Sequence, residues 1–289
     1  MKTDRLAPML CLKDGTQVPR LGQGTWYLGQ GLSPRGQEVD TLRRGIQLGM
    51  TLIDTAEMYG EGRSEQLVGE AIRGLDREQL FLVSKVYPFH AGRGQLGRSL
   101  ENSLRRLGTD YLDLYLLHWR GSIPLAETAR EMERQVRLGR IRRWGVSNLD
   151  AADMEELLST GLGEHCVADQ VLYHLGSRGV EYDLMPWLAR HGMALMAYCP
   201  LAQGGGLRRG LLSAPAVRDA AKAHRVSETQ VLLNFVLQKD NVIAIPKASC
   251  REHVEENARA LDFCLTEAEL RRLNQAFPPP DRPVSLDIV

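Results

Sequence analysis

Short apolar segments alternate with longer amphipathic segments along most of the chain. The apolar segments are six to eight residues long and often end on a polar side chain, a pattern typical of buried strands in a parallel sheet. Between them, stretches such as LGRSLENSLRRLG place apolar residues three or four positions apart, as amphipathic helices do. The strands that this pattern predicts are residues 20–25, 49–54, 80–86, 111–118, 141–147, 166–172, 193–199 and 241–246.

Most of these strands recur at roughly thirty residues, the length of one βα unit. The gap between 199 and 241 is longer and predicts an extra helix or loop around GGGLRRGLLSAP. An Asp14-Gly15 turn before the first strand predicts a β-hairpin, and Thr266 begins one more amphipathic helix after the eighth unit. We therefore expect residues 1–289 to form a single α/β domain, a (β/α)8 TIM barrel with an N-terminal β-hairpin and an extra C-terminal helix.

A doubly wound Rossmann sheet is the alternative architecture for repeated β and α elements. It would carry a GxGxxG fingerprint after its first strand. Here Gly22 and Gly24 are followed by Tyr27 at the third glycine position, and the glycines at 204–206 do not lie in a strand-to-helix turn of the required kind. The barrel is the architecture that the sequence favours.

Composition excludes several classes of function. The 36 basic residues balance the 36 acidic ones, so no strong field favours a nucleic acid or an anionic membrane as partner. No apolar stretch approaches the roughly 20 residues that span a bilayer, and the N-terminus lacks an apolar leader, so we expect a cytoplasmic protein. Five scattered cysteines without a CxxC pair argue against a disulfide framework and a metal site.

Polar side chains stand at or just beyond the ends of seven of the eight predicted strands. In a barrel the carboxyl ends of the strands meet at one rim, where such side chains form a site. Only six basic residues are lysines, which can titrate when buried, and two of those six, Lys85 and Lys247, stand at the ends of apolar strands. The residues at strand ends are Asp54, Lys85, His118, Ser147, Asn148, Gln170, Tyr198 and Lys247.

Three of these residues and one loop tyrosine suggest a reaction. Asp54 and Lys85, on neighbouring strands, can form a buried ion pair, and the loop after Asp54 brings Tyr59 over it. We expect the ammonium to lower the pKa of the phenol from its usual value of about 10 and make Tyr59 a proton donor. His118 can bind the same substrate oxygen. A proton donor beside an oxyanion site, without a nucleophile, suits carbonyl reduction by a hydride cofactor.

The chain resembles the aldo-keto reductase superfamily from Gly22 to about Phe277. The matching stretches are GQGTW, LIDTAEMYGEGRSEQLVGEAI, LVSKV, SLRRLGTDYLDLYLLHW, GVSN, DQVLYH, AYCPLAQGG and IPKA, and the nearest likeness is to short-looped bacterial members that reduce methylglyoxal or 2,5-diketogluconate. The resemblance implies NADPH-dependent reduction of small aldehydes, ketones or dicarbonyls to alcohols. It also implies a catalytic tetrad of Asp54, Tyr59, Lys85 and His118, with Tyr59 as the acid.

The resemblance also assigns the ligand contacts. NADPH would contact Gly24, Thr25, Asp54, Ser147, Asn148, Gln170 and Tyr198 at the nicotinamide, Cys199, Leu201 and Gln203 at the pyrophosphate, and Lys247, Ser249, Arg251, His253 and Asn257 at the adenosine end. The substrate would contact Trp26, Tyr87, His118, Trp119 and Arg120. His253 stands where the family has an arginine and Ala248 where it has a serine, so NADH remains an alternative cofactor.

The role of Arg120 and the exact activity stay open from the sequence alone. Arg120 is either an anchor for acidic substrates or an exposed charge at the rim, and the brief tail after Phe277 predicts an open pocket. The chain could also be a sugar or polyol dehydrogenase, or a cofactor-binding regulatory or redox-sensing subunit. A monomer is the commonest form in this family, and the sequence does not identify the physiological substrate.

Overall fold

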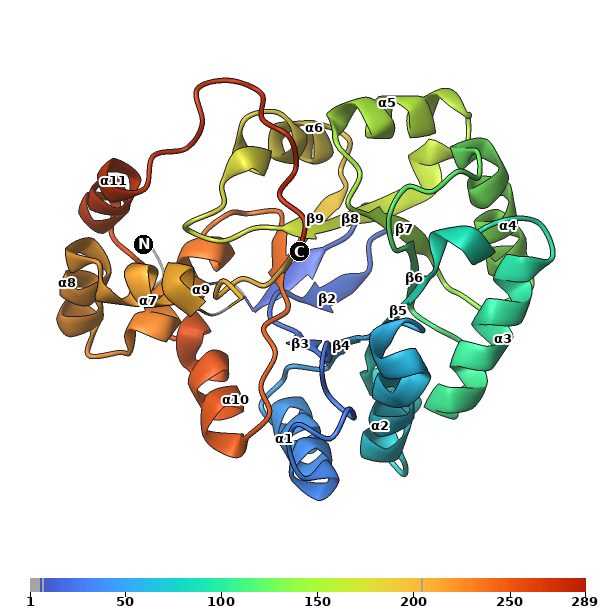
Figure 1. The fold of residues 1–289 in the computed structure, drawn as a ribbon, viewed down its shortest axis with the longest axis horizontal. Coiled ribbons are helices and arrows are strands. Elements are labelled where there is room, and N and C mark those ends of the chain that lie inside the picture. Colours follow the sequence, from blue (N-terminus) through green and yellow to red (C-terminus); the bar gives the residue numbers. More distant parts are fainter. Residues whose placement is uncertain (1–5, 7, 204) are drawn as a thin grey trace.

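The protein folds around a sheet of eight parallel strands, seen end-on in Figure 1. The computed structural model describes residues 6, 8–203 and 205–289. Neighbouring strands follow each other in sequence order, with every pair parallel. The strands of this sheet are β3 (Gln23–Gly24), β4 (Leu52–Asp54), β5 (Phe81–Val86), β6 (Leu114–Leu117), β7 (Trp144–Ser147), β8 (Cys166–Leu172), β9 (Ala194–Tyr198) and β10 (Val242–Ala244).

Hydrogen bonds between residues 20–22, just before β3, and the last strand, β10, close this sheet into a barrel. Leu21 forms a parallel bridge with Ala244, whose amide donates to the Arg20 carbonyl at 2.8 Å. The amide of Gly22 donates in turn to the Ala244 carbonyl at 2.9 Å. The predicted (β/α)8 barrel is confirmed, although most strands are shorter than predicted and only β8 has the predicted bounds.

Helices surround the barrel in Figure 1 and follow most of its strands. They are α1 (Arg35–Gln47), α2 (Arg63–Ile72), α3 (Gln95–Leu107), α4 (Leu125–Arg137), α5 (Ala151–Ser159), α6 (Leu184–Arg190), α7 (Gly205–Ser213), α8 (Pro215–His224), α9 (Glu228–Leu237), α10 (Arg251–Ala258) and α11 (Glu267–Ala276). The long gap before β10 thus holds two extra helices, α7 and α8. The extra C-terminal helix is α11, which begins at a capping box formed by Thr266 and Glu269. Across the described residues, no helix has both the length and the apolar character to span a bilayer.

The core has two layers, one inside the barrel and one between the strands and the helices. Inward side chains such as Leu116 and Met196 fill the barrel, and most outward ones pack under amphipathic helices. The predicted hairpin is present as β1 (Met9–Cys11) and β2 (Gln17–Pro19), paired antiparallel. Leu10 and Val18 of this hairpin belong to the inner cluster, so the hairpin closes one end of the barrel.

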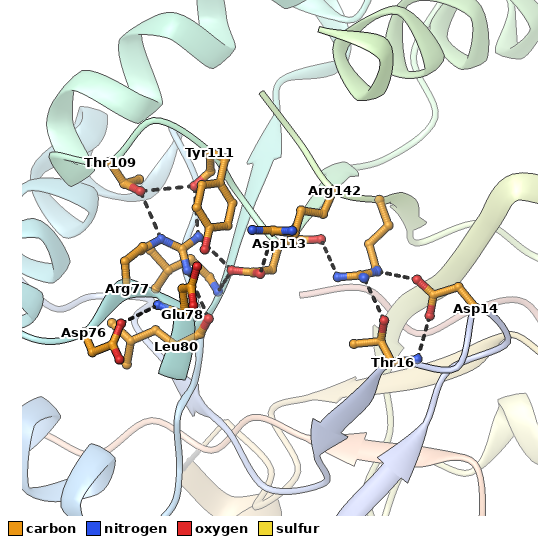
Figure 2. Close-up of polar contacts among 12 residues, drawn as sticks. Asp14, Thr16, Asp76, Arg77, Glu78, Leu80, Thr109, Tyr111, Asp113 and Arg142 are labelled. Carbon is orange, nitrogen blue, oxygen red and sulfur yellow. Dashed lines mark hydrogen bonds and ion pairs between the residues drawn. The ribbon is translucent and has the colours of Figure 1, made fainter. Parts of the chain in front are cut away.

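A polar network ties the hairpin to the amino-terminal ends of the strands (Figure 2). Asp113, which precedes β6, accepts hydrogen bonds from Arg77 Nη2 at 2.7 Å and from the Leu82 amide at 2.9 Å. Arg143 donates to Asp14 Oδ2 and Thr16 Oγ1, both at 2.7 Å. Since the amino-terminal end of such a barrel serves stability rather than chemistry, the carboxyl ends of the strands are left for the site.

Candidate active site

Asp54, Lys85 and Tyr59 form one buried cluster at the carboxyl ends of β4 and β5. Lys85 Nζ lies 2.8 and 2.7 Å from the two carboxylate oxygens of Asp54 and 3.0 Å from the Thr55 carbonyl. The same nitrogen lies 3.1 Å from Tyr59 Oη. Lys85 is 0% exposed and Asp54 2% exposed. Because the charges neutralise each other and every donor of the ammonium has an acceptor, the barrel can hold the pair without water.

A short turn fixes the position of Tyr59 over this pair. The chain leaves β4 at Asp54 and forms a 3₁₀ helix, Tyr59–Gly62, in which Gly60 and Glu61 both have a φ of +57°. Ser64, at the start of α2, donates its hydroxyl to the Leu28 carbonyl at 2.7 Å and anchors the end of the turn. The phenol therefore points at the ion pair from a backbone held at both ends.

The pKa of Tyr59 differs from the prediction. Burial is the largest influence and raises the pKa of the phenol well above 10, and the negative charge of Asp54 raises it further. The predicted lowering by Lys85 is wrong for this state, because the ammonium is already neutralised by Asp54. Tyr59 is therefore held protonated, which is the form that a proton donor needs.

His118 follows β6 and faces Tyr59, with the ring centroids 5.6 Å apart in an edge-on arrangement. Burial, followed by the positive charge of Lys85, lowers the pKa of His118 to about 2, so its imidazole is neutral. Its Nδ1 is buried without a hydrogen-bond partner in the described part of the chain. The ring also lines the cavity over these groups, so the neutral tautomer that carries its proton on Nε2 can donate a hydrogen bond to a substrate oxygen without changing its own charge.

Residues from β7, β8 and β9 complete the rim through direct hydrogen bonds. Gln170 Nε2 donates to Asp54 Oδ1 at 2.7 Å across the mouth. Ser147 Oγ donates to the Gln170 carbonyl at 2.8 Å, and Tyr198 Oη donates to Asn148 Oδ1 at 2.9 Å. The structure thus brings together residues that the sequence separates by more than a hundred positions.

A cavity of about 840 Å³ opens over these groups. A volume of this size lies within the range of cofactor and drug-sized ligand pockets. The predicted residues that line it are Gly24, Thr25, Trp26, Asp54, Tyr59, His118, Trp119, Arg120, Ser147, Asn148, Gln170, Tyr198, Cys199, Leu201, Gln203, Lys247, Ser249, His253 and Asn257. Gly24 has no room for a side chain, because a Cβ there would lie 2.7 Å from the Ile245 carbonyl.

Three predicted residues do not line the cavity. Lys85 lies buried beneath its floor. Tyr87 packs edge-on against Trp119 with ring centroids 5.3 Å apart, so it supports the wall from behind. Arg251 extends along α10 to Glu255, with a distance of 3.0 Å between its Nε and the carboxylate.

The far end of the cavity carries free polar groups. Asn257, 2% exposed, has a side-chain Nδ2 without a hydrogen-bond partner in the described residues. Lys247, Ser249 and His253 lie along the same wall. A buried amide that lacks a partner costs free energy, so this end fits a ligand that carries its own polar edge.

Arg120 is paired at the rim. Its Nη1 contacts Asp153, and its Nη2 lies 2.7 Å from Glu156, both on α5. Asp153 also takes part in the capping box that begins α5. The guanidinium therefore braces the loop after β6 against α5, and a substrate carboxylate would have to compete with two protein carboxylates.

Several cavity residues were missed by sequence reasoning. The chain end crosses toward the barrel mouth in Figure 1, and Ile288 and Val289 line the cavity there. Asp287 accepts a hydrogen bond from Ser177 Oγ at 2.5 Å and holds this segment in place. The pocket is therefore narrower than the sequence predicted, because Ile288 and Val289 occupy part of its mouth. The other missed residues are Tyr27, Met58, Pro200, Ala202, Arg208, Thr229, Ile245, Pro246 and Glu256.

Comparisons with known proteins agree with this geometry. The model of the aldo/keto reductase family matches residues 20–277. The chain is 54% identical over 281 residues to methylglyoxal reductase YeaE of Escherichia coli (strain K12), covering 97% of this chain and 99% of that protein. It is 33% identical over 265 residues to glyoxal reductase of Bacillus subtilis (strain 168), covering 91% and 90% of the two chains.

A solved structure with the same fold carries a cofactor. An aldo/keto reductase from Klebsiella pneumoniae, solved in complex with NADP and acetate, is 54% identical and superposes with a TM-score of 0.95. The alignment covers 98% of this chain and 100% of that one. A family match over most of the barrel, together with relatives aligned over nearly their full lengths, shows that the chain belongs to the aldo/keto reductase family.

Proposed function

We propose that this chain is an NADPH-dependent reductase that converts small aldehydes, ketones or dicarbonyls, such as methylglyoxal, to alcohols. The observation that carries the proposal is the contact between Tyr59 Oη and Lys85 Nζ at 3.1 Å, in the floor of a cavity large enough for a cofactor. No other arrangement among the described lining residues offers a protonated donor beside a charge that can stabilise its conjugate base.

The roles of the residues follow from their protonation states. The substrate oxygen accepts hydrogen bonds from Tyr59 and neutral His118, which orients the carbonyl. Reduced nicotinamide, when bound, supplies a hydride for the carbonyl carbon. As negative charge develops on the oxygen, Tyr59 transfers its proton there, and the phenolate left behind is stabilised by Lys85. Asp54 holds the ammonium in place during this transfer, and solvent later returns a proton to Tyr59.

The remaining lining residues fit the cofactor. Ser147, Asn148 and Gln170 offer the polar groups that a carboxamide needs, and Tyr198 offers a ring face for stacking. The unpartnered Asn257 amide suits an adenine edge, and Lys247 with His253 suits a 2′-phosphate. The Klebsiella neighbours, solved with NADP and with NADPH, support the same cofactor for this chain.

The pocket walls support a small substrate. Trp26 stacks on Tyr27 and lies 6.3 Å, centroid to centroid, from Tyr59, and Trp119 lies on the other side beside His118. These rings give the cavity an apolar lining beside the acid, which suits short carbonyl compounds. The name of the Escherichia coli relative supports methylglyoxal as the first compound to try.

The proposal extends to the cellular compartment, the oligomeric state and the partners of the enzyme. We propose a cytoplasmic monomer in which residues 1–289 act as one domain, with no nucleic-acid or membrane partner. The five cysteines are free thiols in the structure, which suits a reducing compartment. Size-exclusion chromatography with light scattering tests the monomer directly.

The proposed activity is tested by following absorbance at 340 nm with methylglyoxal and either NADPH or NADH. We expect rapid oxidation of NADPH and slower oxidation of NADH. Faster turnover of polyols with NADP⁺ than of aldehydes with NADPH would indicate a sugar or polyol dehydrogenase instead of a reductase. Tight cofactor binding without turnover across a panel of aldehydes would favour the regulatory subunit and contradict the proposal.

A further inference from the structure

Glu65, in the first turn of α2, has a buried carboxylate that does not line the cavity. The residue is 0% exposed, and both of its carboxylate oxygens have partners. Oε1 accepts a hydrogen bond from Ser84 Oγ at 2.6 Å, and Oε2 lies 2.5 Å from Arg106 Nε on α3. Burying a charge costs free energy even when it is paired, and apolar side chains would join these elements at a lower cost. The two partners of the carboxylate indicate what the charge adds.

Ser84 connects Glu65 to the strand that carries Lys85. It directly precedes Lys85 on β5, so the two side chains lie on opposite faces of the strand. Lys85 reaches Tyr59 on the cavity side, whereas Ser84 reaches α2 on the outer side. Burial lowers the pKa of Lys85, Asp54 opposes that shift most strongly, and the charge of Glu65 opposes it further. Glu65 thus fixes the outer face of β5 at the position of the catalytic ammonium.

Arg106 connects the same carboxylate to the turn that carries Tyr59. The turn ends at Gly62, whose φ is +87°, and a Cβ at Gly62 would lie only 2.6 Å from Cδ of Arg106. The arginine side chain therefore packs directly on the backbone of the turn. Its Nη2 also donates to Ser103 Oγ at 3.2 Å. Because Glu65 and Ser103 fix the guanidinium, the end of the turn rests on an immobile side chain.

We propose that Glu65 and Arg106 are positioning residues for the reduction, and that they hold the phenol of Tyr59 on the ammonium of Lys85. This inference rests on the proposed function. One carboxylate joins the two elements that carry these groups, so its loss lets the turn and β5 move independently. The 3.1 Å contact between Tyr59 Oη and Lys85 Nζ depends on their register. A displacement of about 1 Å at a reacting group can lower a rate by about 100-fold.

The variant Glu65→Gln tests the role of the carboxylate. It keeps the size of the side chain, removes the charge and weakens the contact with Arg106. We expect kcat for methylglyoxal to fall roughly 10- to 100-fold. The KM for methylglyoxal and the dissociation constant of NADPH should stay close to the wild-type values, since neither ligand contacts Glu65. Quenching of tryptophan fluorescence measures the dissociation constant, because Trp26 and Trp119 line the cavity.

Variants of Arg106 test the contact with the turn. Arg106→Met should lower kcat by a factor similar to that of Glu65→Gln, and Arg106→Lys should restore part of kcat because it keeps the charge. Arg105→Met, at the exposed neighbouring position on α3, is the matched control and should keep the wild-type kcat. The kcat is referred to the concentration of NADPH-binding sites, so that a partly unfolded preparation does not imitate a slower reaction.

Combination with Tyr59→Phe separates positioning from a general loss of stability. Because Glu65 acts through the phenol, Glu65→Gln should lower kcat far less in the Tyr59→Phe background than in wild type. An equal fall in both backgrounds would overturn the inference. A wild-type kcat in Glu65→Gln, or an equal loss in Arg105→Met, would overturn it as well. Full activity of the single variant Tyr59→Phe would instead contradict the proposed function.

Discussion

Lys85 contacts both carboxylate oxygens of Asp54 and the phenol of Tyr59 from one buried position. Burial lowers the pKa of the ammonium, and the carboxylate opposes that shift and keeps it charged. The pair is thus neutral as seen from a distance, while one N–H remains directed at the phenol. Burial, together with the negative charge of Asp54, keeps Tyr59 protonated at rest, and Lys85 still stabilises the phenolate once the proton has left.

Lys85→Met should separate the contribution of the Asp54–Lys85 ion pair to stability from its contribution to catalysis. The variant leaves Asp54 buried without its partner, so we expect a loss of roughly 3–5 kcal/mol in the free energy of unfolding. We also expect kcat to fall by about 10²- to 10⁴-fold, because general acid catalysis is lost. Urea unfolding and methylglyoxal turnover measure the two effects.

The double variant Asp54→Asn/Lys85→Met is the control for that experiment. Removing both charges should recover much of the stability, since no unpaired charge remains, while kcat stays low. Full activity in the double variant would show that the ion pair is structural only.

The pH profile of kcat should be flat from about pH 6 to pH 9. His118 has its pKa lowered to about 2, so it is already neutral throughout this range and its titration produces no acid limb. Tyr59 has its pKa raised above 10, so the donor loses its proton only at higher pH. An acid limb with a midpoint near 6.5 that disappears in His118→Asn would show that His118 works as an imidazolium.

Asp169 should make the fold less stable as the pH rises. It is fully buried on β8, on the side opposite to its neighbour Gln170, and burial raises its pKa well above the usual value, an effect that the Leu149 amide only partly opposes. The folded state therefore keeps a proton that the unfolded state loses above about pH 4. Stability then falls by up to about 1.4 kcal/mol per pH unit until the folded-state pKa is reached.

Asp169→Asn tests that dependence through thermal melts at pH 5 and pH 8. The variant should be more stable than wild type, and its advantage should be larger at pH 8. Asp219→Asn, at an exposed position on α8, is the matched control and should show no such difference. An advantage that does not change with pH would contradict the protonated state of Asp169.

Arg120→Ala should not change the preference between anionic and uncharged aldehydes. Its guanidinium already contacts Asp153 and Glu156, so it has little charge to offer a substrate carboxylate. The ratio of kcat/KM for succinic semialdehyde to that for methylglyoxal measures the preference. A selective loss of kcat/KM for the anionic aldehyde would establish Arg120 as a substrate anchor.

Because the two ion pairs of Arg120 are exposed at the rim, Arg120→Ala should lower the free energy of unfolding by less than about 1 kcal/mol.

The barrel could be predicted because each strand has a local signature in the sequence. β8 appears there as an apolar run with the same bounds as in the structure, and the residues at strand ends meet because parallel strands share one rim. The path of the tail and the direction of Arg208 could not be predicted, because both depend on packing between distant segments, such as Asp287 on Ser177. The direction of the Tyr59 pKa shift was predicted wrongly because the sequence does not show how completely the phenol is buried, and burial raises its pKa more than any other influence.

Tyr59→Phe, compared with wild type in two measurements on the same preparations, tests the role of the phenol directly. The substitution removes only the phenolic oxygen, so NADPH should bind with the wild-type dissociation constant by fluorescence quenching. We predict that kcat for methylglyoxal falls by at least about 10²-fold, while Tyr182→Phe, exposed and outside the cavity, retains wild-type turnover. Undiminished turnover by Tyr59→Phe would show that Tyr59 is not the proton donor.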